Sequence, residues 1–156
     1  MAMVAVARAI HYGKIIWRPT MNILESAIDS WYPGVLSILR VVVAYLFLQH
    51  GTAKLFHVPR LAMFDQLRVW SRDGFAGMIE IVGGSLMLLG LLTRPVALIL
   101  SGEMAIGYFW VHARQGHVLM PALNDGEEAV LYFFVFLLLA TVGGGPWSVD
   151  ALLHRP

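Results

Sequence analysis

Five ionisable side chains fall inside or beside long apolar stretches of this sequence, where a bilayer would surround them. They are three bases and two acids: Arg40, His50, Lys54, Glu80 and Glu103. An unpaired charge is costly in hydrocarbon, so these cations and carboxylates are expected to meet in the interior of a helix bundle. Because the bases donate hydrogen bonds and Glu or His can exchange protons, the cluster could bind the polar head of a lipid-soluble molecule such as a quinone.

The composition indicates an integral membrane protein. Of 156 residues, 58% are hydrophobic and 13% charged, whereas a soluble domain carries about 25% charged residues. A helix needs about 20 apolar residues to cross the hydrocarbon core. Four stretches approach or reach that length, at about 34–56, 74–92, 95–112 and 127–143. The expected fold is therefore all-α, an integral-membrane four-helix bundle with short interfacial helices.

The chain is predicted to have one transmembrane domain, 34–150, between two smaller segments. Residues 1–33 are expected to form an amphipathic, interfacial N-terminal segment, and 151–156 a C-terminal tail. Arg8 interrupts the apolar start of the chain too early for a cleavable signal. In the link 57–73 apolar residues recur every three positions, which predicts a short interfacial helix.

The turns are predicted from residues that typically begin or end helices. Thr93–Pro95 leaves little chain between the second and third spans, so these should form an antiparallel hairpin. Glu127 and Glu128 open the fourth span, where negative charge suits a helix N-terminus. Ser148 and Asp150 are expected to cap a short helix in the tail.

Charge and cysteine content exclude several classes of function. A net charge of +1 gives no reason to expect nucleic acid as a partner. Without cysteine, the chain can form no disulfide, thiol relay, iron–sulfur ligation or Cys-ligated zinc site. A slight excess of Lys and Arg on the side of the termini favours a multi-pass protein of the bacterial inner membrane with cytoplasmic termini.

Helix geometry predicts which charges should pair. At 100° per residue, Arg40, His50 and Lys54 share a stripe of roughly 80° and should all point inward. Arg40 should lie about 9 Å deep from the side of the termini and Glu103 about 12 Å, so these two are predicted to pair. Glu80 should lie about 9 Å deep from the opposite side, in a second cluster with His50 and Lys54.

Two alternatives to a quinone site remain open, and a third is not expected. The ion pairs could be structural and fix only which helices are neighbours, aided by close approach at Gly51, Gly83 and Gly84. A small transporter or proton-conducting element would need an oligomer to line a path. Haem ligation by histidines is not expected, because neither His112 nor His117 lies well inside a span. No metal site is predicted.

The sequence resembles the DoxX family of small four-helix membrane proteins from about Arg40 to Asp150. The resemblance rests on the order and spacing of several motifs, which are Arg40 with His50-Gly51-x-x-Lys54-Leu55, Glu80 with Gly83-Gly84, Leu89-Gly90-Leu91-Leu92-Thr93-Arg94, Gly126-Glu127, and Gly145-Pro146-x-Ser148-Val149-Asp150. Residues 1–33 fall outside it.

The resemblance implies a role beside a redox enzyme. The family is named for a terminal-oxidase subunit, and similar proteins include membrane subunits of thiosulfate:quinone oxidoreductase and of complexes that handle oxidative stress and sulfur compounds. The chain is therefore expected to be a membrane subunit of such a complex, without an intrinsic cofactor, with quinone as the candidate ligand, and not catalytic alone. Its expected partners are membrane lipids and either another protein of a membrane complex or further copies of itself. The alternative is a non-catalytic anchoring or assembly subunit whose buried ion pairs are structural.

Overall fold

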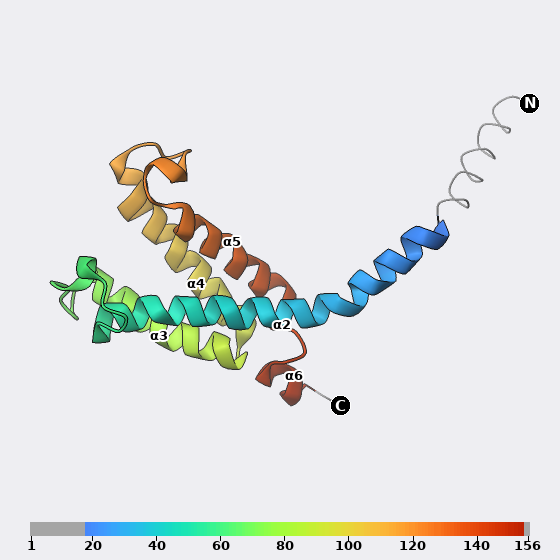
Figure 1. Cartoon of the computed structure of the whole chain (residues 1–156). Coiled ribbons are helices and arrows are strands. Elements are labelled where there is room, and N and C mark those ends of the chain that lie inside the picture. The colour runs from blue at the N-terminus through green and yellow to red at the C-terminus, as the bar shows by residue number, and fades with distance from the viewer. Residues whose placement is uncertain (1–17, 155–156) are drawn as a thin grey trace, which may run out of the picture. The chain divides into compact units, whose positions relative to one another are not determined.

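The computed structural model describes residues 18–154, and every regular element in that part of the chain is helical (Figure 1). The long helices are α2 (Arg18–Phe56), α3 (Arg72–Leu89), α4 (Thr93–Gly107) and α5 (Glu127–Val142), and a short α6 (Val149–Leu153) follows. A π-helical turn η2 (Tyr108–His112) extends α4, and three 3-10 turns complete the list: η1 (Ala62–Phe64), η3 (Ala113–Gln115) and η4 (Pro121–Leu123). The predicted all-α class is confirmed.

Two helical segments are long and apolar enough to cross a membrane. They are Glu25–Phe56, with 32 residues, and Thr93–Gln115, with 23 residues. The other two long helices are less typical of spans, because α3 contains three charged residues in 18 and α5 has only 16 residues. Four spans were predicted from the sequence, and the structure by itself supports two candidates.

The chain divides into two compact units, Met1–Val35 and Leu36–Pro156. The described part of the first unit is the beginning of α2, which contains Pro33 and exposes Trp31 and Tyr32. Of the interfacial segment predicted for residues 1–33, residues 1–17 lie outside the described residues.

Interdigitated apolar side chains form the core of the second unit. Phe47 of α2 meets the rings of Tyr132 and Phe136 of α5 edge-on, at centroid distances of 5.3 and 4.9 Å. The rest of this core consists of Leu36, Val43, Ala44, Met87, Val96, Ala97, Leu100 and Leu139. The helices that carry the charged residues are thus held together by apolar packing from α2 through to α5.

Glycines allow close approach between neighbouring helices, as predicted. A Cβ added to Gly51 of α2 would lie 2.9 Å from the backbone nitrogen of Ile81 in α3. A Cβ on Gly83 would lie 2.6 Å from a methyl carbon of Leu100 in α4. Larger residues would force the helices apart at the level of the buried charges.

The α2–α3 loop and the α4–α5 loop differ in how many hydrogen bonds hold them. The interfacial helix predicted for 57–73 is wrong, because only the three-residue turn η1 forms there. Pro59 and the left-handed backbone of His57 interrupt the segment, and helices this short are marginal without packing. In the α4–α5 loop, by contrast, the buried amide of Asn124 donates to the carbonyl oxygens of Gly116 and His117 and accepts from the N–H of Gly126.

Candidate functional site

Arg40 is buried at one end of the bundle, with 1% of its surface exposed. Its guanidinium donates hydrogen bonds to four backbone carbonyls, those of Met87, Leu88 (2.8 Å), Gly144 (2.9 Å) and Trp147 (2.5 Å). The last carbonyls of a helix lack partners within the helix. Arg40 therefore caps the C-terminus of α3 and ties it to the chain that follows α5.

The predicted ion pair between Arg40 and Glu103 is wrong. The depth of Arg40 was counted from an expected helix start near Gly34, but α2 begins at Arg18, so the start of the helix does not mark a membrane surface. The contacts of Arg40 place it level with the end of α3. Glu103 is ten residues into α4, about 15 Å along the helix axis from Thr93.

Asp150 completes the structure around Arg40. Its two carboxylate oxygens accept from the backbone N–H groups of Leu92 and Thr93, each at 2.8 Å, and its own N–H donates to the carbonyl of Gly90 at 2.9 Å. Burial raises the pKa of Asp150, but these hydrogen bonds outweigh it and hold the pKa below its ordinary value. Asp150 therefore caps α4 and not the tail helix for which it was predicted.

Ser148 does cap α6 as predicted, because its hydroxyl accepts from the N–H of Ala151. Gly90 takes a left-handed conformation, φ +68°, and an added Cβ would lie 2.4 Å from Ser148 Cβ and 2.8 Å from the Arg40 guanidinium. Three of the separated sequence motifs thus meet around one arginine. Every interaction there is used in holding helix ends together, so this part of the predicted site is structural.

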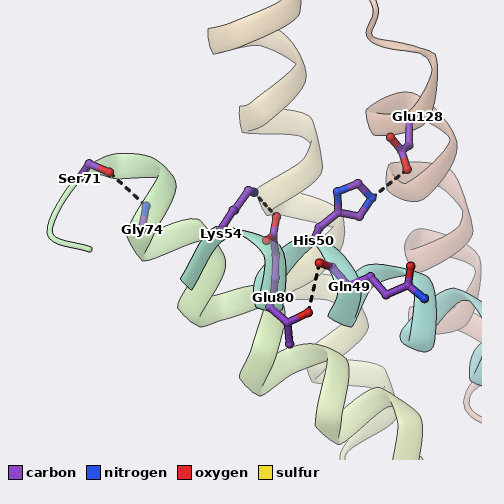
Figure 2. A network of polar contacts seen from close by, with 8 residues as sticks. Gln49, His50, Lys54, Ser71, Gly74, Glu80 and Glu128 are labelled. Atoms are coloured by element: carbon purple, nitrogen blue, oxygen red, sulfur yellow. Dashed lines mark hydrogen bonds and ion pairs between the residues drawn. The ribbon is translucent and has the colours of Figure 1, made fainter. Parts of the chain in front are cut away.

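Lys54 and Glu80 form the ion pair that was predicted between α2 and α3 (Figure 2). Glu80 is 1% exposed, and the Lys54 side chain is mostly buried. Only Oε1 of Glu80 contacts Lys54, while Oε2 is buried and finds no hydrogen-bond partner in the described part of the chain. The Lys54 ammonium also lies 5.7 Å from the ring centroid of Phe64 in η1. This pair therefore leaves one carboxylate oxygen and part of the ammonium donor capacity unused.

His50 turns towards α5 and not towards Glu80, as Figure 2 shows. Its Nε2 lies 2.9 Å from Oε1 of Glu128, and its ring meets that of Tyr132 edge-on at 6.1 Å. His50 was predicted to lie in one cluster with Lys54 and Glu80; it is close enough to act on Glu80 electrostatically, but its direct polar contact is with Glu128. Glu128 was missed as a site residue because its place at a helix start already accounted for its charge. The available signal was its spacing to Tyr132, since residues i and i+4 share a helix face.

Glu103 lies in the interior of the bundle, and both of its carboxylate oxygens are buried without a hydrogen-bond partner among residues 18–154. Lys54 and Glu80 are close enough to act on it electrostatically. Buried polar atoms are nearly always hydrogen-bonded, so each exception needs an explanation. Lys54, Glu80 and Glu103, which we call the acid site, together present three free acceptor oxygens beside one cation.

Metal ligation does not explain these free oxygens. Within residues 18–154, no group of three or more His, Cys, Asp or Glu side chains is placed to hold a metal ion. What the acid site can do chemically is accept hydrogen bonds or protons and offer an ammonium N–H to a carbonyl oxygen.

These features define a helical membrane protein whose buried charges form two separate sets, one around Arg40 and one at the acid site. The sequence profile of the DoxX family matches residues 35–113. The chain belongs to the DoxX family.

Two relatives are similar over most of their length, and both are described only as uncharacterized. A protein of Haemophilus influenzae is 42% identical over 130 residues, which cover 79% of this chain and 93% of the relative. A membrane protein of Mycobacterium tuberculosis is 30% identical over 158 residues, 86% of this chain and 95% of the relative. No solved structure matches the chain significantly.

Proposed function

We propose that this protein is a membrane subunit of a redox complex and that its acid site binds the head group of a lipid-soluble quinone. The observation that carries the proposal is the set of three buried, unpartnered carboxylate oxygens next to Lys54. Leaving such groups unsatisfied is costly unless a ligand or a proton satisfies them.

A quinone and its reduced form both complement this set of groups. A quinone carbonyl would accept from the Lys54 ammonium, and a hydroquinone hydroxyl would donate to a free oxygen of Glu80 or Glu103. Oxidation of the hydroquinone releases two electrons and two protons. The carboxylates would take up the protons, and the electrons would pass to the partner in the complex, because a chain without cysteine has no thiol or iron–sulfur centre of its own.

The quinone proposal includes four membrane crossings, so that the acid site lies within the bilayer. After the exposed Arg72 and Asp73 of its first turn, the exposed large side chains of α3 are all apolar, among them Phe75, Ile79 and Val82. The exposed faces of α5 carry Leu131 and Phe134 in the same way. Such surfaces suit contact with lipid chains, which supports the inclusion of α3 and α5 in a transmembrane bundle.

The test is the quinone content of the purified full-length chain, measured by mass spectrometry after extraction from bacterial membranes in mild detergent. We expect the wild type to retain quinone. The control variant Glu127→Gln, which changes an exposed glutamate of α5, should also retain it. Glu103→Gln should retain at least about tenfold less, since a hydrogen bond to a charged group contributes about 1.5–3 kcal/mol. Far-UV circular dichroism must show that both variants are folded. Absence of quinone from the wild type, or equal content in Glu103→Gln, would overturn the proposal.

A second candidate function, non-catalytic anchoring or assembly, is favoured by the Arg40 network, whose groups are used only to hold helix ends together. In that case substitution of Glu103 would change the yield of an assembled complex and leave the activity per complex unaltered. Normal assembly with abolished turnover would exclude an anchoring role.

A further inference from the structure

A cavity of about 530 Å³ lies at the Arg40 end of the bundle, away from the acid site. Its walls are the first turn of α4, the turn that follows α5, and α6. The polar groups in its lining come mainly from Arg94, from the backbone of Gly143–Gly145, from Asp150 and from His154.

Arg94 is the cation of this cavity, and it has no ion pair or hydrogen bond within the described part of the chain. Among the described residues, the carboxylate of Asp150 makes no direct contact with Arg94, and its two oxygens accept from backbone N–H groups of the α3–α4 turn. A cation in the first turn of a helix is unfavourable to the helix dipole. Helix stability therefore does not account for Arg94, and its exposed side chain is free to meet an anion in the cavity.

The glycine turn offers further donors to an anion. Gly143 and Gly145 have positive φ angles of 91° and 73°, and no hydrogen bond within residues 18–154 uses the N–H of Gly144 or of Gly145. The carbonyl of Gly144 points to Arg40. In a trans peptide the N–H of the next residue points the opposite way, so the N–H of Gly145 faces away from that guanidinium. Successive free N–H groups in such turns form anion-binding concavities.

Arg94 stands beside this turn. A Cβ added to Gly143 would lie 3.5 Å from Nε of Arg94, so the guanidinium and the turn border the same space. A planar guanidinium with free backbone N–H groups nearby matches the oxygens of a phosphate group.

The position of the cavity relative to the membrane indicates where that phosphate would come from. Arg94 is the second residue of the candidate span Thr93–Gln115, which places it at the level of lipid head groups. Trp147, on the chain between α5 and α6, is 63% exposed, and tryptophan is typical of this interfacial layer.

We infer that this cavity binds the phosphate of an anionic phospholipid head group, with Arg94 and the N–H groups of the glycine turn as its donors. The inference is independent of the quinone proposal, because it uses none of the residues of the acid site.

The experiment measures the thermal unfolding of the full-length chain in a neutral detergent with added phosphatidylglycerol, phosphatidylcholine or inorganic phosphate. The variants are Arg94→Gln and Arg114→Gln, the latter changing an exposed arginine in the loop at the other end of the bundle. Arg94→Lys keeps the charge but loses the planar fork, and it should give an intermediate response.

We expect phosphatidylglycerol alone to raise the unfolding temperature of the wild type and of Arg114→Gln. Its apparent affinity for Arg94→Gln should be at least about tenfold weaker. An equal response of Arg94→Gln and the wild type would overturn the inference, as would an equal effect of phosphatidylcholine. The same shift with inorganic phosphate at matched concentration would overturn the assignment to a lipid. If Arg94→Gln does not fold, native mass spectrometry of the wild type and Arg94→Lys decides by the same criterion.

Discussion

Replacement of Arg40 by methionine tests the structural role of this buried charge separately from the function of the acid site. Methionine has a side chain of similar length but donates no hydrogen bond. The carbonyl oxygens of Met87, Leu88, Gly144 and Trp147 therefore lose the hydrogen bonds that Arg40 donates to them. Hydrogen bonds to a charged group contribute about 1.5–3 kcal/mol each. Desolvation of the guanidinium offsets much of their sum, while each buried carbonyl that is left unsatisfied costs about 1–3 kcal/mol.

We therefore expect Arg40→Met to lower the free energy of unfolding by about 3–5 kcal/mol. For a chain of this size the unfolding temperature should fall by an amount on the order of 10 °C. Circular dichroism during heating in detergent measures this fall. Arg114→Met, at an exposed arginine, is the matched control and should stay within about 0.5 kcal/mol of the wild type.

The same variant also tests the division of the site into two sets. Below its unfolding temperature, Arg40→Met should retain as much quinone per folded chain as the wild type. Unchanged stability would refute the structural role of Arg40. A stable variant that has lost its quinone would show that Arg40 belongs to the ligand site after all.

Three further substitutions test the turns. Asp150→Asn should lower the free energy of unfolding at pH 7 by about 1 kcal/mol, as the loss of a helix cap does. Melting curves of the two proteins in the same detergent measure this difference. Because folding lowers the pKa of Asp150 from 3.8, its stabilisation is present above pH 3.8 and is lost as the pH falls through the folded-state value. The difference between wild type and Asp150→Asn should therefore shrink on acidification, and a constant difference would contradict the assignment. Gly90→Ala should destabilise the fold by about 1–3 kcal/mol, because the added Cβ would strain a left-handed backbone and press on Arg40. The control is Gly102→Ala, at a helical position where an added Cβ would have no atom within 4 Å. It should be neutral or stabilising in the same heating assay. Asn124→Ala should increase amide hydrogen exchange in the α4–α5 loop and leave exchange in α3 unchanged, since its hydrogen bonds are local to that loop.

The sequence by itself determined the class of the molecule and much of its local structure. The apolar composition and the lengths of the apolar stretches depend on no tertiary contact, so the membrane character and the all-α class could be read directly. Gly51 and Gly83 could be predicted as points of close approach because small residues next to buried charges have few other uses. The pair of Lys54 and Glu80 followed from depth in the bilayer, which is a property of each helix alone.

Only the tertiary structure decided the partners of the remaining charges. Arg40 could not be assigned, because its acceptors are backbone carbonyls at helix ends, and carbonyls are present at every position of every sequence. Asp150 binds N–H groups 57 and 58 residues away for the same reason. The rotation of each helix about its axis decides that His50 contacts Glu128. It also decides that Glu103 meets no partner among the described residues. That rotation is set by the packing of side chains such as Phe47, and a one-dimensional pattern does not contain it.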